Sequence, residues 1–276
     1  MSVPIGIIGL DLDGTLLNND KRISPRTMAA LEAAQAQGVY LVPVTGRPHL
    51  GVPRLVRELP FVRYLISCNG AAIRDNITDE FVRERTIPLP LALKLLEILR
   101  RHGAPHEALY RGQGYGEPWV YRQMIAMHPE NLFLPAYIRD SRKTVHDMAD
   151  FLADGHGPEE LFIMTESREQ REEIAQSLAE IQGISVVFPA ARALEITAAG
   201  VDKGEALLYL ADYLGVHPGG VMAVGDSGND LAMLRAAAFP VAMGNAAPKV
   251  KAMSKFITAT NEEDGVGLAI EEFVLG

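Results

Sequence analysis

The feature that most constrains this chain is an apolar run that ends in two closely spaced aspartates. Residues 5–10 read IGIIGL, and Asp11, Asp13 and Gly14 follow almost directly. The run is too short to cross a membrane, and its β-branched residues indicate a strand that is buried on both faces. Two like charges at the end of such a strand are costly unless a cation lies between them. The residues therefore point to a Mg²⁺ site with a carboxylate nucleophile, although Asp-Gly is also a common turn pair.

Three later segments carry polar groups in comparable positions, at the end of an apolar strand or at the start of a helix. They are residues 39–47 (VYLVPVTGR), 202–207 (DKGEAL) and 221–230 (VMAVGDSGND). Together with residues 11–17 (DLDGTLL), they resemble, in order, the four motifs of the haloacid dehalogenase (HAD) superfamily. Residues 69–71 (NGA) and 243–246 (MGNA) further resemble the Cof-type sugar-phosphatase branch of that superfamily.

The resemblance implies an α/β fold, with a Rossmann-like parallel-sheet core and an inserted α+β cap domain. Alternating strand and helix patterns at both ends of the chain favour such a core. We expect residues 1–85 to form the first part of the core, residues 86–191 the cap, and residues 192–276 the second part. The insert lies between the second and third motifs, and its mixed content resembles a type 2B cap.

The resemblance also implies a division of roles among the acidic residues. Asp11 is expected to attack phosphorus and form an aspartyl-phosphate, and Asp13 to protonate the leaving alcohol. Leu12 is expected to contribute only its backbone amide, to a phosphate oxygen. Mg²⁺ would cancel the repulsion between carboxylate and phosphate. Its expected ligands are Asp11, Asp13 through its main-chain carbonyl, Asp226 and Asp230.

Five other residues are expected to bind the phosphate, and most have a plainer alternative. Thr45 and Gly46 offer a hydroxyl and an N–H to phosphoryl oxygens, or Thr45 simply caps a helix. Lys203 opens a helix, where its charge opposes the helix dipole. We expect Lys203 to neutralise the transferred phosphoryl group, the alternative being a lysine in solvent. Arg47 is expected either to reach a substrate anion or to form a surface ion pair, and the resemblance implies that Asn229 contacts phosphate.

Composition narrows the classes of partner. The 276 residues carry a formal net charge of −9, which argues against nucleic acid or an anionic membrane surface. No segment has the length of a transmembrane helix and no basic leader precedes the first apolar run, so we expect a cytoplasmic protein. The single cysteine, Cys68, excludes an internal disulfide framework and a Cys-rich zinc site. A monomer or homodimer is expected.

The leading hypothesis is a Mg²⁺-dependent phosphomonoester hydrolase acting on small phosphorylated metabolites, such as sugar phosphates. A phosphomutase or phosphotransferase would use the same aspartyl-phosphate, and a non-catalytic metabolite-binding protein is the alternative from another class. A dehalogenase is disfavoured because Asp13 would have no role in carbon–halogen cleavage. Substrate choice is expected to lie in the insert. There, an aromatic cluster that includes Tyr115 and Trp119 is either domain core or a substrate-facing surface.

Overall fold

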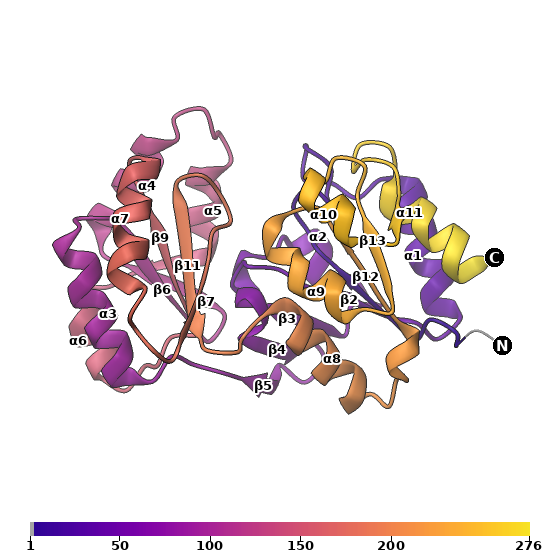
Figure 1. The fold of residues 1–276 in the computed structure, drawn as a ribbon, viewed down its shortest axis with the longest axis horizontal. Coiled ribbons are helices and arrows are strands. Elements are labelled where there is room, and N and C mark those ends of the chain that lie inside the picture. Colours follow the sequence, from indigo (N-terminus) through magenta and orange to yellow (C-terminus); the bar gives the residue numbers. More distant parts are fainter. Residues whose placement is uncertain (1–2) are drawn as a thin grey trace. The chain divides into compact units, whose positions relative to one another are not determined.

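The computed structural model of the chain describes residues 3–276, which fall into two compact units (Figure 1). Unit 1 comprises the described residues up to Gly46, together with Pro53–Val82 and Asp202–Gly276. Unit 2 comprises Arg47–Val52 and Arg83–Val201, so the chain passes from one unit to the other four times. None of the described helices combines the length and the apolar character that a transmembrane segment needs.

Unit 1 is built on a parallel sheet of five short strands, in the order β14-β13-β12-β1-β2. The strands are β1 (Ile7–Leu10), β2 (Tyr40–Pro43), β12 (Val221–Gly225), β13 (Phe239–Ala242) and β14 (Phe256–Ile257). As the apolar run predicts, every residue of β1 is buried. Because β1 and β12 are adjacent and parallel, the residues that follow them emerge at the same edge of the sheet.

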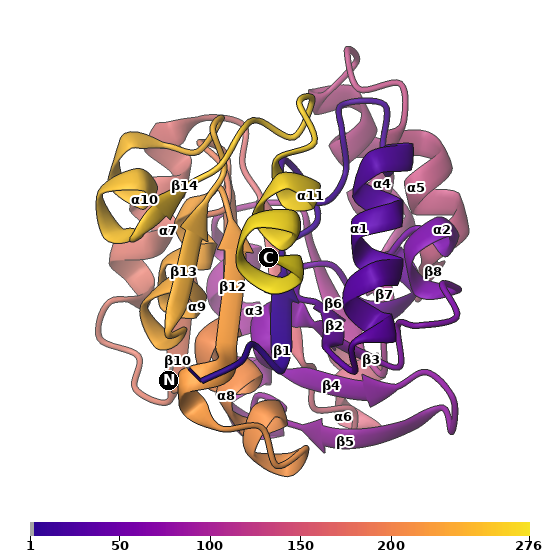
Figure 2. The ribbon, with the colours of Figure 1, turned by 90° about the vertical axis from the view of Figure 1, so that its right-hand side faces the viewer.

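Helices cover both faces of this sheet (Figures 1 and 2). They are α1 (Pro25–Ala36), α2 (Arg54–Arg57), α8 (Lys203–Tyr213), α9 (Leu231–Ala236), α10 (Pro248–Met253) and α11 (Gly265–Ile270). The start of α1 follows the sequence signal, since Ser24 Oγ accepts the N–H of Thr27 and Pro25 is the first helical residue. Helices α8 and α9 approach closely at Gly204, where a Cβ would lie 2.4 Å from the backbone oxygen of Ala232.

A small three-stranded sheet, in which β3 and β4 are antiparallel, consists of β3 (Tyr64–Ser67), β4 (Ala72–Asp75) and β5 (Glu80–Glu84). Its strand β3 runs beside the end of β2, because Val44 forms a parallel bridge with Ile66 and Thr45 donates its N–H to the Ile66 carbonyl at 2.9 Å. The turn from β3 to β4 passes through Cys68 and Asn69, whose φ angles of 49° and 52° are left-handed. Cys68 is buried, as expected for a core thiol.

Unit 2 contains a six-stranded sheet in the order β10-β11-β9-β6-β7-β8. The strands are β6 (His106–Tyr110), β7 (Gln113–Gly116), β8 (Arg142–Thr144), β9 (Glu160–Met164), β10 (Ile184–Val187) and β11 (Ala193–Ala198). Strand β11 pairs with both β9 and β10, which makes it an inner strand of this sheet. The insert therefore ends after β11 and not at residue 191 as expected, and its main segment begins at Arg83 rather than at residue 86.

Two apolar clusters lie on opposite faces of the unit 2 sheet. The helices are α3 (Leu89–Arg101), α4 (Pro118–Met127), α5 (Leu134–Ser141), α6 (Met148–Ala153) and α7 (Arg168–Leu178). The larger cluster joins α3, α6 and α7 to Ile163 of β9, whereas the smaller one joins α4 and α5 to Phe162 and Met164. Neighbouring residues of a strand point to opposite faces. Of the aromatic residues, Tyr115 packs on the larger cluster and Trp119 on the smaller one.

The outlying segment Arg47–Val52 is held inside unit 2. The N–H of Leu50 donates to the Gly112 carbonyl at 2.8 Å. The guanidinium carbon of Arg47 lies 5.0 Å from the centre of the Tyr137 ring. A backbone hydrogen bond and a cation–π contact thus attach the residues that follow the second motif to the insert.

Candidate active site

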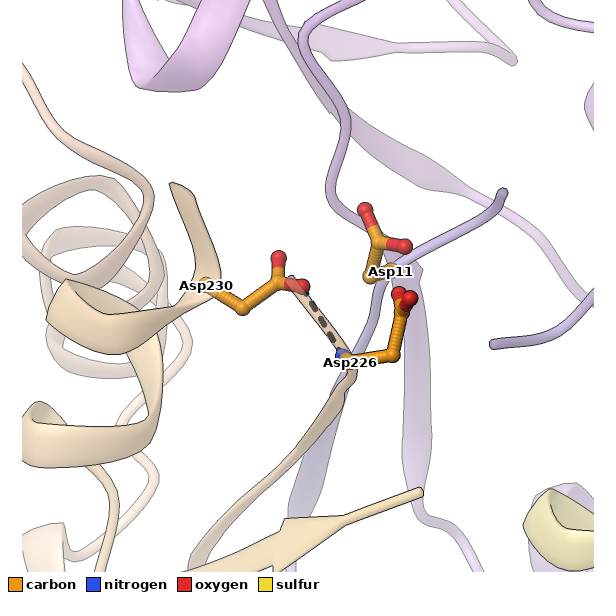
Figure 3. Close-up of side chains that lie close together, drawn as sticks. All are labelled: Asp11, Asp226 and Asp230. Carbon is orange, nitrogen blue, oxygen red and sulfur yellow. Dashed lines mark hydrogen bonds between the residues drawn. The ribbon is translucent and has the colours of Figure 1, made fainter. Parts of the chain in front are cut away.

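Three aspartates come together at the carboxyl edge of the unit 1 sheet (Figure 3). Asp11 follows β1 directly and Asp226 follows β12 directly, and these strands are parallel neighbours in register. Asp230 directly precedes α9. One carboxylate oxygen of each of the three lies within 4.8 Å of the other two. The first and fourth motifs thus contribute the three carboxylates of one compact acidic cluster.

The loop between β12 and α9 is folded around the Asp230 carboxylate. Its Oδ2 accepts the N–H groups of Asp226 at 3.0 Å and of Ser227 at 2.9 Å, and the Ser227 hydroxyl at 3.3 Å. Gly225 permits this fold, because a Cβ at that position would lie 2.6 Å from the Asp230 Cβ. The Asp230 side chain is completely buried, and its hydrogen bonds join the two ends of the loop.

Lys203 links two members of the cluster. Its Nζ donates to Asp11 Oδ1 at 2.6 Å and to Asp230 Oδ1 at 2.7 Å. The alternative of a lysine in solvent is excluded, since only 1% of the Lys203 side chain is exposed. Asp202 caps α8 by accepting the N–H groups of Gly204 and Glu205, each at 2.8 Å, which fixes the helix end that carries the lysine.

The cluster is short of positive charge. Burial, and next the charge of Asp230, raise the pKa of Asp11 to about 8, although Lys203 opposes the shift. The same two causes raise the pKa of Asp226 to about 6. Burial alone would lower the pKa of the Lys203 amine, but the charges of Asp11 and Asp230 outweigh it and the pKa is raised. The protonated amine thus stays in place while two carboxylates resist ionisation.

These residues fit a small divalent cation. When all are ionised, the three carboxylates and one amine leave a formal charge of −2. Carboxylate oxygens are the ligands that Mg²⁺ prefers. Both oxygens of Asp230 already accept hydrogen bonds, from Lys203 and from the loop, so Asp11 and Asp226 are the better placed ligands.

A polar network links Thr45 of the second motif to Asn229 of the fourth through Asn69. Thr45 is buried, and its carbonyl accepts the N–H of Asn69 at 3.0 Å. The Asn69 Oδ1 in turn accepts from Asn229 Nδ2 at 3.4 Å, and Asn229 Oδ1 accepts from Ser227 Oγ at 2.6 Å. Asn69 was not among the predicted site residues, although its motif, NGA, contributed to the family resemblance.

The segment after β1 contributes two further contacts that were not predicted, one to Asp226 of the cluster and one to Asp13. Thr15 Oγ1 donates to Asp226 Oδ1 at 3.1 Å. Lys21 Nζ lies 2.7 Å from Asp13 Oδ1. The Leu12 side chain is fully buried. The hydroxyl at Thr15 belongs to the DxDGT motif, but the contact of Lys21 depends on how the following turn folds.

Arg47 is placed differently from the other predicted site residues. Gly46 is the last residue of the first segment of unit 1, and Arg47 belongs to unit 2. Besides its contact with Tyr137, the Arg47 guanidinium donates to the Gly51 carbonyl at 3.0 Å. Tyr137 and Gly51 both belong to unit 2, so these two contacts of Arg47 lie within that unit.

Comparisons with known proteins agree with this arrangement. The family model for haloacid dehalogenase-like hydrolases matches residues 8–270. The Bacillus subtilis 5-amino-6-(5-phospho-D-ribitylamino)uracil phosphatase YcsE is 30% identical over 273 residues, which are 99% of this chain and 97% of that protein. The Escherichia coli pyridoxal phosphate phosphatase YbhA is 27% identical over 269 residues, 94% of this chain and 95% of that protein.

A solved structure leads to the same family. A haloacid dehalogenase-like hydrolase from Bacteroides thetaiotaomicron superposes with a TM-score of 0.82 at 31% sequence identity, covering 97% of this chain and 98% of that one. The predictions of an HAD fold and of an HAD-type phosphatase are confirmed by these likenesses. The chain belongs to the haloacid dehalogenase-like hydrolase family.

Proposed function

We propose that this protein is a Mg²⁺-dependent phosphomonoester hydrolase that works through an aspartyl-phosphate on Asp11. The observation that carries the proposal is the buried Asp11 carboxylate, held by Lys203 at 2.6 Å and grouped with Asp226. A buried carboxylate with a raised pKa, between a fixed amine and a second carboxylate, is typical of a site for catalysis rather than for stability.

The cation would be held by Asp11 and Asp226, with the main-chain carbonyl of Asp13 as a third ligand and water completing the shell. Asp230, which the sequence analysis also put among the ligands, supports the site chiefly by holding Lys203 and the loop. When bound, Mg²⁺ supplies the positive charge that lets a carboxylate approach a phosphate dianion. The proposal explains why the cluster, taken alone, resists ionisation.

The residues of the chain then divide the chemistry into two steps. In the first, a carboxylate oxygen of Asp11 forms a bond to phosphorus while the bond from phosphorus to the ester oxygen breaks, and Asp13 gives its proton to that oxygen. In the second, water attacks phosphorus, Asp13 takes a proton from the water, and Asp11 is restored as phosphate leaves. Lys203 keeps Asp11 in one orientation throughout.

The transferred phosphoryl group is proposed to contact donors around Asp11. These are the amides of Leu12 and Gly46, the Thr45 hydroxyl, the Asn229 side chain and the amine of Lys203. Backbone and side-chain donors held in place before the reaction stabilise developing negative charge without reorganisation. Arg47, whose guanidinium contacts Tyr137 and the Gly51 carbonyl, remains a candidate for binding a substrate anion.

The proposed substrates are small phosphorylated metabolites, sugar phosphates or similar. Two similar proteins are named for the hydrolysis of a phosphorylated ribitylaminouracil and of pyridoxal phosphate. Both compounds are phosphomonoesters of small polar molecules. A phosphomutase would share the aspartyl-phosphate but pass the phosphoryl group to a second substrate rather than to water, so release of inorganic phosphate separates the two activities.

The test measures inorganic phosphate released from a panel of phosphorylated metabolites, with Mg²⁺ or with EDTA. Wild type is compared with Asp11→Asn and with Asp212→Asn, an exposed aspartate of α8 that serves as the matched control. We expect release to need both Mg²⁺ and Asp11 and to be unchanged in Asp212→Asn. Full activity of Asp11→Asn, or release that persists in EDTA, would contradict the proposal.

A further inference from the structure

Lys21 lies in a tight turn that directs its side chain at Asp13. The N–H of Lys21 donates to the Asn18 carbonyl at 2.9 Å, and the N–H of Asn18 donates to the Arg22 carbonyl at 3.0 Å. The Asn18 side chain closes the turn by accepting the N–H of Arg22 at 2.8 Å. Lys21 has a left-handed φ of 59°, a conformation that glycine adopts more readily than lysine.

The turn and the loop that carries Asp13 are held by the same part of unit 1. Three contacts from the C-terminal region do this: Asn245 Nδ2 to the Gly14 carbonyl at 2.8 Å, Asn261 Nδ2 to the Leu17 carbonyl at 3.1 Å, and the Asn19 N–H to Glu262 Oε1 at 2.6 Å. In addition, Asp13 forms an isolated bridge with Leu17. The spacing between Lys21 and Asp13 is therefore set by backbone contacts on both sides of the pair.

Stability does not account for this ion pair. The Lys21 and Asp13 side chains are 39% and 40% exposed, and their N–O distance is 2.7 Å. An exposed pair of this kind contributes little to the free energy of unfolding. A left-handed conformation is unfavourable for a residue other than glycine, so the pair at best balances the strain of the turn. Local strain of this kind is found where function requires a particular geometry.

We propose that Lys21 is a positioning residue, which holds the Asp13 carboxyl group in the orientation from which it serves the leaving-group oxygen. The inference rests on the proposed function, in which Asp13 is the general acid. Asp13 lies in the turn-forming stretch after β1 and its side chain is partly exposed, so we expect loss of the Lys21 contact to widen its choice of rotamers. The ammonium group of Lys21 selects one of them.

The role predicts a dependence on the leaving group. An alkoxide leaves only if it receives a proton, whereas p-nitrophenolate leaves as a stable anion and gains little from a general acid. Loss of Lys21 should thus lower kcat for glycerol 2-phosphate about ten-fold, a part of the full contribution of a general acid. With p-nitrophenyl phosphate the fall should stay below about two-fold. A merely structural role would lower both by the same factor.

The experiment compares Lys21→Met and Lys21→Gly with wild type on these two substrates. Lys21→Gly also relieves the left-handed strain, so a loss of activity in that variant does not arise from misfolding. Lys21→Arg keeps a cation and should recover most of the lost kcat. Arg22→Met removes an exposed cation from the same turn and is the matched control. In an Asp13→Asn background, Lys21→Met should have no further effect on either substrate.

Three results overturn the inference. Equal losses on both substrates, no loss on either, or a further loss in the Asp13→Asn background would each show that Lys21 does not act through Asp13. These results leave wild-type hydrolysis intact and so leave the proposed function standing. Absence of phosphate release by wild type from both substrates would remove the proposed function and, with it, the role of Lys21.

Discussion

Replacing Asp230 by asparagine should destabilise the protein because no orientation of an amide satisfies the neighbours of this carboxylate. Asp230 Oδ1 faces the Lys203 amine at 2.7 Å, and Oδ2 faces the N–H groups of Asp226 and Ser227 at 3.0 and 2.9 Å. Every one of these partners is a donor. Whichever way the introduced amide is turned, its NH₂ group opposes at least one of them at hydrogen-bond distance.

The size of the effect follows from burial. The side chains of Lys203 and Asp230 are 1% and 0% exposed, and removal of one partner from a buried pair costs about 3–5 kcal/mol. The lower end applies, because Lys203 keeps its contact with Asp11 at 2.6 Å. For a chain of this length, about 3 kcal/mol corresponds to a fall in the thermal midpoint of roughly 6–12 °C.

The assay is thermal unfolding followed by far-ultraviolet circular dichroism, without added metal. The isosteric change Asp212→Asn, on the exposed face of α8, is the matched control and should leave the midpoint unchanged. In the double variant Lys203→Met/Asp230→Asn the amine that would face the introduced amide is absent, so the two losses should be clearly less than additive. A midpoint for Asp230→Asn within about 2 °C of wild type would refute the account of the loop.

Two other predictions concern charge. Mg²⁺ should bind more tightly at about pH 9 than at about pH 6, because Asp11 and Asp226 must lose their protons before they bind it. The pKa of Asp11 is raised to about 8 and that of Asp226 to about 6. Isothermal titration calorimetry measures the affinity at each pH, and an affinity independent of pH would contradict the prediction. In unit 2, Arg142→Met should lower stability by about 3 kcal/mol, because it leaves the Glu107 carboxylate buried without the guanidinium that binds it at 2.6 and 2.9 Å. Urea unfolding followed by the single tryptophan, which lies in the same unit, checks the second prediction, and Glu107→Gln/Arg142→Met should recover part of the loss.

The parts of the site that could be predicted lie at the ends of strands and at the start of a helix. Asp11 and Asp226 follow buried apolar runs, and parallel pairing of those runs is enough to bring them to one edge. The position of Lys203 was also predictable, from a different signal. A cation at a helix N-terminus is repelled by the helix dipole unless negative groups lie near it. Here the carboxylates of Asp11 and Asp230 supply that negative charge.

The remaining features depend on contacts that periodicity does not encode. Asn69 and Lys21 both lie in turns with left-handed residues, and their contacts with Asn229 and Asp13 arise from the path of irregular backbone. The end of the insert was misplaced for a related reason. Strand β11 reads as apolar in either unit, and only its antiparallel partners β9 and β10 decide where it belongs.

The path of Arg47–Val52 has a consequence for recombination between relatives. Deleting residues 83–201 would remove Gly112 and Tyr137, and with them the backbone and aromatic partners of this segment. A chimaera that exchanges only residues 83–201 would place the native segment Arg47–Val52 against the residues of another protein. That segment would then lack the contacts that it makes in the native chain. Exchanging the whole of unit 2 between relatives would therefore require two exchanges, residues 47–52 together with residues 83–201.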